Sequence, residues 1–222
     1  MDKPKETPPL PSPPPSLLRH VVNLDTTLSQ SIHTLCQPVI PRAVLKLLEI
    51  TGDGRLWFPV SLSFILSPVS LHSSTLYSFS LSLLLGLLTD ILFIGLLKHL
   101  IRRQRPHYNP AMGTTIPVDH WSFPSGHSSR VFFIASLFSL SISAIGEGID
   151  QLRFRDQAIV DRWIGGQDSG EVVAVMLVLV WIWSLLTSIS RVLLGRHFVL
   201  DVVAGAFVGV FNGAIVHRFL KF

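Results

Sequence analysis

Two long apolar segments of this chain are joined by the sequence SRVLLGRHFVLD, residues 190–201. The stretch places a cation, a histidine and a carboxylate where an ordinary membrane sequence has none of them. His197 and Asp201 are four residues apart, so in a helical turn they share one face and the carboxylate can accept the proton of one imidazole nitrogen. The other nitrogen would be free as a nucleophile, and Arg191 adds a planar charge that suits phosphate oxygens. The alternative is that these residues only reach toward lipid headgroups.

The composition of the chain is that of a membrane protein. Only 14% of the 222 residues are charged, against roughly 25% in soluble domains, and the mean hydropathy is +0.50. The net charge of +4 would suit a nucleic-acid-binding protein, but the lysines and arginines lie at the ends of apolar runs. We therefore expect a membrane and an anionic substrate as partners, and no nucleic acid. The single cysteine, Cys36, excludes an intramolecular disulfide and has no metal-ligand spacing around it.

The first part of the chain is expected to lie outside the membrane core. Residues 1–16 contain seven of the 15 prolines, and such a sequence cannot bury a core, so we expect a disordered tail. Residues 17–55 repeat apolar residues at three- and four-residue spacing, interrupted by Pro38 and Pro41. This pattern predicts two amphipathic helices that lie on the membrane surface or against the bundle.

The remainder, residues 56–222, is predicted to be an all-α membrane domain with about five spans. No Asp, Glu, Lys or Arg occurs from residue 56 to residue 89. One helix of that length would extend about 50 Å, more than the roughly 30 Å hydrocarbon core, so we expect a turn near residues 71–75. Polar, glycine-rich loops separate the five predicted spans, which are residues 56–71, 75–100, 127–147, 171–193 and 199–219.

The direction of the predicted spans brings distant segments together. If the second span ends on one side of the membrane, the fourth span returns to that side. Segments 98–127 and 190–201 should therefore meet on one face. Basic residues near this face favour the cytosol, and we expect an integral protein of the endoplasmic reticulum membrane.

Segment 98–127 supplies further parts of a phosphate site. In its first part, KHLIRRQRP, Lys98 and Arg105 are seven residues apart, so they share one helical face at an interval of two turns. Pro106 then ends the helix. Arg102 and Arg103 are interpreted as anchors at the membrane surface.

The second part of this segment, WSFPSGH, precedes an apolar helix. Ser125 is a good helix cap, and Gly126 lets the backbone approach a ligand. The unpaired amides of the new helix can bind an anion, and His127 lies beside them, placed to hold or donate a proton. Asp90, inside the second predicted span, is open to a functional or a structural interpretation.

The charges of these motifs fit a phosphate group. Lys98, Arg105 and Arg191 offer three positive charges against the two of a phosphate monoester. The sequence has no cluster of carboxylates or of Cys and His ligands. We therefore expect no metal, and expect the cations to do the electrostatic work that Mg²⁺ does in other phosphatases.

Taken together, the three motifs resemble a known signature. The patterns are K-x6-RP at residues 98–106, PSGH at 124–127 and SR-x5-H-x3-D at 190–201. They are similar, without substitution, to the three-part signature of the type 2 phosphatidic-acid phosphatase (lipid phosphate phosphatase) superfamily. Residues 51–59, TGDGRLWFP, and 119–123, DHWSF, resemble the branch of plant lipid phosphate phosphatase beta and animal presqualene diphosphate phosphatase.

The resemblance implies a membrane enzyme that removes phosphate from lipids such as phosphatidate or isoprenoid diphosphates, without a cofactor. His197 would attack phosphorus to give a phosphohistidine, Asp201 would orient His197, and His127 would protonate the leaving group. The residues implied to hold the phosphate are Lys98, Arg105, Ser125, Gly126 and Arg191.

Two alternatives accompany this interpretation. A non-enzymatic binder or transporter of phosphorylated lipids or sugar phosphates could use the same fold. A vanadium-dependent haloperoxidase has a similar site, but such enzymes are soluble and the apolar spans argue against it. The sequence leaves the physiological substrate and the oligomeric state open.

Overall fold

The computed structural model describes residues 16–37, 39–108 and 120–220, and within these ranges the regular elements are helices. The predicted tail, apart from Ser16, and Asp119 of the DHWSF motif lie outside the described residues. In chain order the helices are α1 (Ser16–Cys36), α2 (Arg42–Thr51), α3 (Gly54–Leu66), α4 (Pro68–Leu71), α5 (Ser74–Ile101), α6 (Gly126–Leu140), α7 (Ile142–Arg155), α8 (Gln157–Ile164), α9 (Ser169–Leu193) and α10 (Val199–Phe219).

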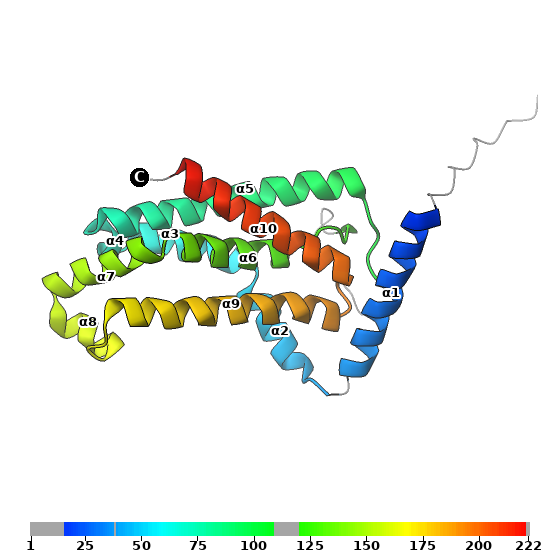
Figure 1. Ribbon diagram of the computed structural model, residues 1–222, viewed down its shortest axis with the longest axis horizontal. Helices are drawn as coiled ribbons and strands as arrows, with labels where there is room; N and C mark the ends of the chain where they lie inside the picture. The colour runs from blue at the N-terminus through cyan, green and yellow to red at the C-terminus, as the bar shows by residue number, and fades with distance from the viewer. Residues whose placement is uncertain (1–15, 38, 109–119, 221–222) are drawn as a thin grey trace, which may run out of the picture.

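The long helices α5, α6, α9 and α10 run alongside one another, as Figure 1 shows. The carboxyl ends of α5 and α9 and the amino ends of α6 and α10 lie at the same end of the bundle, and α1 crosses this end (Figure 1). A hydrogen bond from the Ser125 amide to the Asp201 carbonyl, 2.9 Å long, joins the two segments there. The prediction that segments 98–127 and 190–201 meet at one end is therefore confirmed.

The prediction of five spans is wrong for the described chain. Three helices, α5, α9 and α10, are long and apolar enough to cross a membrane, and α6 with α7 passes the same test as a pair bent by 68°. The first predicted span corresponds to α3, which has 13 residues and a length of about 20 Å, and to the short α4. The two are separated at Ser67, whose backbone is extended, because the residue before a proline avoids the helical conformation.

A second correction concerns the third predicted span, residues 127–147. The structure divides it at Ser141, between α6 and α7. Serines at 139, 141 and 143 surround the bend, and the Ser139 hydroxyl donates to the Ala135 carbonyl (2.7 Å); such side-chain bonds to the backbone compete with regular helix bonds. Beyond the bend, α7 and α8 are helical up to Ile164, where the sequence predicted a polar loop.

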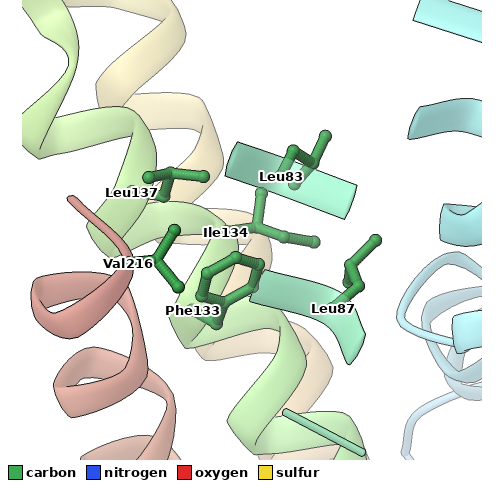
Figure 2. Close-up of a cluster of buried hydrophobic side chains, with 6 residues drawn as sticks. All are labelled: Leu83, Leu87, Phe133, Ile134, Leu137 and Val216. Carbon is green, nitrogen blue, oxygen red and sulfur yellow. The ribbon is translucent and has the colours of Figure 1, made fainter. Parts of the chain in front are cut away.

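The core of the bundle lies between α5, α6 and α10. Gly86 of α5 allows α5 and α6 to pack closely, because a Cβ added at this position would lie 2.0 Å from Cζ of Phe133. The ring therefore rests directly on the backbone of α5. Figure 2 shows the buried side chains of this cluster, which are Leu83, Leu87, Phe133, Ile134, Leu137 and Val216.

A stripe of three glycines on α10 forms its contact with α6. Gly205, Gly209 and Gly213 are four residues apart and therefore share one face of the helix. A Cβ added at Gly205 would lie 2.4 Å from the Ser125 carbonyl oxygen, and one at Gly209 would lie 2.0 Å from the Ser129 carbonyl oxygen. The two backbones thus touch, and the first turn of α6 is fixed against the first turns of α10.

Candidate active site

The turn between α9 and α10 sets the position of His197. After Leu193 the chain reverses at Gly195, which has a φ of 64°, a conformation that favours glycine. The amides of Arg196 and His197 both donate to the carbonyl of Arg191, at 3.0 and 3.2 Å. This turn folds the buried imidazole back beside the guanidinium of Arg191 and explains the spacing of the motif.

Asp201 is held in place by several donors. Its Oδ2 accepts the amide of Phe198 (2.9 Å), and its Oδ1 accepts Nη1 of Arg103 (2.7 Å). The same Oδ2 lies 3.6 Å from Nδ1 of His197, which is longer than a normal hydrogen bond but within ion-pair distance. The carboxylate therefore faces Nδ1, and Nε2 is the ring nitrogen that does not face Asp201.

The environment of His197 favours the neutral imidazole. Burial lowers the pKa of His197 to about 4, and the charges of Arg105 and Arg191 act in the same direction, while Asp201 opposes them. At neutral pH the ring therefore carries a lone pair on one nitrogen. That is the form of histidine that can act as a nucleophile.

Lys98 and Arg105 approach the same place, Lys98 from α5 and Arg105 from the segment after it. The prediction that both lie on one helical face that ends at Pro106 is wrong, because α5 ends at Ile101. Lys98 lies buried in the last turn of that helix, which ends at Arg102 in the left-handed conformation (φ 50°). The next residues run beside the segment that precedes α6, because the Ser122 amide donates to the Arg103 carbonyl (2.8 Å). Arg105 is also buried, and its Nη1 donates to the Arg196 carbonyl in the turn that carries His197 (3.3 Å).

Ser125 caps α6 but does not offer its amide to a ligand. Its hydroxyl oxygen accepts the Ser128 amide (3.4 Å), and its own amide donates to the Asp201 carbonyl (2.9 Å). In this structure the Ser125 amide is therefore paired with the first turn of α10. The amides of Gly126 and His127, the first two residues of α6, are the remaining candidates, because the first turn of a helix has no intrahelical acceptors for them.

His127 lies in the first turn of α6, within electrostatic range of Lys98, Arg191 and His197. Its Nε2 is buried and has no hydrogen-bond partner among the described residues. The structure thus brings all the predicted site residues to one end of the bundle, namely Lys98, Arg105, Ser125, Gly126, His127, Arg191, His197 and Asp201.

Arg103, which was predicted to be an anchor at the membrane surface, belongs to this site. Its guanidinium binds Asp201 and also Asp25 of α1 (2.7 Å to each), and it lies 4.0 Å from the ring centroid of Phe198. Arg103 is largely buried, so the interpretation as a surface anchor is wrong. No sequence motif singled it out from the neighbouring Arg102.

Helix α1 caps α10 beside the site. Asp25 accepts the amide of Leu200 (3.0 Å), and Ser29 accepts the amide of Val199 (2.9 Å). Both side chains are buried and are four residues apart, so they share the inner face of α1. Their spacing indicates that they share a face of α1, but it does not indicate which partner that face contacts.

Glu49 of α2 reaches the phosphate-binding candidate Arg191. Its Oε1 lies 2.8 Å from Nη1 of Arg191 and 3.5 Å from Nε of Arg196, and its Oε2 lies 3.0 Å from Nζ of Lys46. Burial alone would raise the pKa of Glu49, but the three cations outweigh it and lower the pKa to about 2. The carboxylate is therefore charged at neutral pH and partly neutralises Arg191.

The contacts of Asp90 favour the structural interpretation. This fully buried carboxylate accepts a hydrogen bond from the Ser129 hydroxyl of α6. Its Oδ2 lies 3.7 Å from Nη2 of Arg130. Asp90 therefore joins α5 to α6 and lies beside the charge of Arg130.

The chemistry of the lining suits an anion. Among the described residues, no three His, Cys, Asp or Glu side chains are grouped so that they could hold a metal ion. The side chains that approach His197 and His127 are mainly lysine and arginine. A tetrahedral oxyanion between the two histidines would be surrounded by donors.

Comparisons with known proteins show the family of the chain. Residues 79–222 match the model of the PAP2 superfamily. An Arabidopsis thaliana protein described as "Probable lipid phosphate phosphatase beta" is 45% identical over 206 residues, which cover 91% of each chain.

Two solved structures have a similar fold. A transmembrane PAP2-type phosphatidylglycerolphosphate phosphatase from Bacillus subtilis superposes with a TM-score of 0.66 and 23% identity, over 90% of this chain and 86% of that one. LpxE from Aquifex aeolicus superposes with a TM-score of 0.53 and 20% identity, over 88% of this chain and 96% of that one. At these identities the likeness concerns the fold alone.

Proposed function

The chain belongs to the PAP2 superfamily of metal-independent phosphatases, and we propose that it hydrolyses membrane lipid phosphates through a covalent phosphohistidine on His197. One observation carries this proposal: a buried imidazole with a pKa of about 4 lies against a fixed carboxylate and between arginines. Such an imidazole is neutral, oriented and close to charges that can hold a phosphate.

In the first step, the lone pair of Nε2 of His197 forms a bond to phosphorus. The bond from phosphorus to the leaving oxygen breaks, and His127 donates a proton to that oxygen. Asp201 stays ionised and stabilises the positive charge that develops on the ring of His197. Lys98, Arg105 and Arg191, with the amides of Gly126 and His127, would hold the non-bridging oxygens.

In the second step, His127 takes a proton from water while the water oxygen forms a bond to phosphorus. The nitrogen–phosphorus bond breaks, its electron pair returns to His197, and phosphate leaves. Ser125 supports both steps indirectly, because it caps α6 and binds the carbonyl of Asp201.

The lipid nature of the substrate is supported by the surroundings of the site. Helix α1 turns Asp25 and Ser29 toward the site, and it also exposes leucines. A helix with this distribution can lie at the boundary of headgroups and acyl chains. We therefore propose that α1 and α2 lie at the membrane surface, where a lipid such as phosphatidate or an isoprenoid diphosphate presents its phosphate. The endoplasmic reticulum stays our predicted location. The exposed leucines of α1 are Leu17, Leu18, Leu24, Leu28 and Leu35.

The purified protein is expected to release phosphate from at least one lipid of a panel and to continue in EDTA. The panel is phosphatidate, lysophosphatidate, diacylglycerol pyrophosphate, a sphingoid-base phosphate and an isoprenoid diphosphate, each assayed beside His197→Ala. Vanadate, which mimics the pentacoordinate transition state, should inhibit. Loss of activity in EDTA with recovery in Mg²⁺ would reveal a metal site. Tight binding of these lipids without release would favour the non-enzymatic alternative.

Glu49→Gln is expected to strengthen anion binding and to weaken the ligand-free fold. Glutamine keeps the shape of the side chain but removes the charge that competes with phosphate for Arg191. We expect the inhibition constant of vanadate to fall by about ten-fold. The melting temperature without ligand should also fall, because the buried guanidinium of Arg191 loses its counter-charge.

The control for this variant is Lys46→Gln, which breaks the contact between Lys46 and Glu49 and leaves the charge of Glu49 in place beside Arg191 and Arg196. Vanadate inhibition of this control should match that of the native protein. A higher inhibition constant in Glu49→Gln would contradict the prediction. It would mean that Glu49 is needed to hold Arg191 in position for the phosphate.

A further inference from the structure

We propose that Asp53 is a positioning residue for His127, as the counter-charge that stabilises the protonated ring while it donates to the leaving oxygen. This inference rests on the proposed function. It gives His127 a carboxylate partner comparable to the one that Asp201 provides for His197. Asp53 lies between α2 and α3, outside the residues that match the family model.

The distance between the two groups suits this role. Oδ2 of Asp53 lies 4.0 Å from Nε2 of His127, which is within ion-pair distance but beyond hydrogen-bond distance. The buried Nε2 has no hydrogen-bond partner among the described residues. A proton on Nε2 is therefore attracted by the carboxylate without being taken by it, and stays available to the oxygen of a leaving alcohol.

The segment TGDG, residues 51–54, holds Asp53 rigidly. The carbonyl of Thr51 accepts a hydrogen bond from Nε1 of Trp57 (2.7 Å). The hydroxyl of Thr51 accepts one from Nε1 of Trp183 (3.0 Å). The Gly52 carbonyl accepts Nη1 of Arg130, which lies on α6 one turn beyond His127 (3.2 Å). The turn is thus bonded to the same helix that carries the proposed acid.

Gly52 has no room for a side chain in this arrangement. An added Cβ would lie 2.7 Å from Cγ2 of Thr187 on α9 and 3.3 Å from Cγ1 of Val131 on α6. The turn therefore packs directly against both helices. This close contact explains why the TGDG segment has a glycine at position 52.

Asp53 carries a full negative charge at neutral pH. Burial would raise the pKa of Asp53, but hydrogen bonds and charge from Arg55 and the charge of Arg130 outweigh it and lower the pKa. Oδ1 accepts the Arg55 amide and so caps α3 (2.9 Å). The Arg55 guanidinium, 3.0 Å from Oδ2, is 80% exposed, so solvent screens its charge, and the carboxylate still acts on the buried side, toward His127.

The test is Asp53→Asn, which removes the charge and keeps the shape and a good helix cap. On a lipid phosphate we expect kcat to fall by about 10- to 100-fold, which is a part of the rate enhancement that a general acid contributes. On p-nitrophenyl phosphate, whose leaving group needs no proton, we expect a loss of less than about three-fold. The KM for both substrates should stay unchanged, because Asp53 does not touch the phosphate.

The matched control is Arg55→Gln, which breaks the exposed ion pair of Asp53 but leaves the carboxylate beside His127. Its activity ratio between the two substrates should equal that of the native protein. If Asp53→Asn does not fold, Asp53→Ser also keeps a capping hydroxyl and provides the same comparison.

A double-mutant cycle distinguishes a role through His127 from a general one. In a His127→Ala background, Asp53→Asn should cost nothing further on the lipid substrate, because the group it assists is absent. An additional loss in that background, or equal losses on both substrates in the single variant, would overturn the inference. Full activity of His197→Ala would instead overturn the proposed function, so the two failures are distinguishable.

Discussion

His197→Ala is expected to abolish turnover of every phosphate ester, whereas His127→Ala is expected to recover much of its activity on an aryl phosphate. His197 forms the bond to phosphorus, so no leaving group can compensate for its loss. His127 donates a proton to the departing oxygen, and its loss should cost about 10²- to 10⁴-fold on a lipid alkoxide. A p-nitrophenolate leaves without that proton, so the cost should be far smaller.

The measurement is kcat/KM for one lipid phosphate and for p-nitrophenyl phosphate, in both variants and the native protein. Melting temperatures with and without vanadate control for folding and for an intact phosphate site. Equal losses on both substrates in His127→Ala would remove the assignment as general acid. His127 would then be a residue that only binds phosphate or supports the fold.

The meeting of the three motifs at one end of the bundle could be predicted from the sequence, and one of them also encodes a local turn. The spacing from Arg191 to His197 corresponds to a turn in which both amides after Gly195 donate to the Arg191 carbonyl. The geometry of the spacing from Lys98 to Arg105 was predicted wrongly, because α5 ends at Ile101 and Arg105 lies beyond the left-handed Arg102. The family match confirms the resemblance that these motifs predicted.

Successive spans run in opposite directions, and this rule predicted which segments meet although the predicted number of spans was wrong. Losing the first predicted span left the relative directions of α5, α6, α9 and α10 unchanged. Hydropathy could not show that residues 56–71 are too short a helix, because the break at Ser67 comes from proline geometry inside an apolar run.

The contributions of the N-terminal helices could not be predicted from the sequence. Asp25, Glu49 and Asp53 each pair with a cation or histidine that lies far away in the chain. Such pairs depend on how α1 and α2 pack across the end of the bundle, and neither spacing nor composition specifies that packing. The same applies to Arg103, whose partners come from α1 and α10.

The glycine stripe of α10 was also missed. Glycines are common in the apolar helices of membrane proteins, and their spacing does not show in the hydropathy pattern. Only the structure shows that Gly205, Gly209 and Gly213 all face α6. This contact has a functional consequence, because it holds the amino end of α6, with His127, against the amino end of α10, with Asp201. Its disruption should therefore affect both stability and activity.

Among substitutions that add one methyl group to this protein, Gly209→Ala is expected to be one of the most destabilising. The added Cβ would lie 2.0 Å from the Ser129 carbonyl oxygen and 2.8 Å from the Phe133 amide nitrogen. Both are backbone atoms of α6, which cannot rotate away as a side chain would, so the two helices must separate. Overpacking of a core costs about 1–3 kcal/mol and occasionally more, and the backbone contact places this variant at the upper end.

The matched control is Gly95→Ala on α5, where an added Cβ meets no atom within 4 Å. Alanine is favoured over glycine in a helix by roughly 1 kcal/mol, so this control should melt at or slightly above the native temperature. Gly209→Ala gains the same helical preference, and its melting temperature in detergent should nevertheless fall by several degrees. Its residual folded fraction should lose activity even on p-nitrophenyl phosphate, because separating α6 from α10 strains the bond between the Ser125 amide and the Asp201 carbonyl. Equal melting temperatures for the two variants would mean that α6 and α10 do not touch through this stripe.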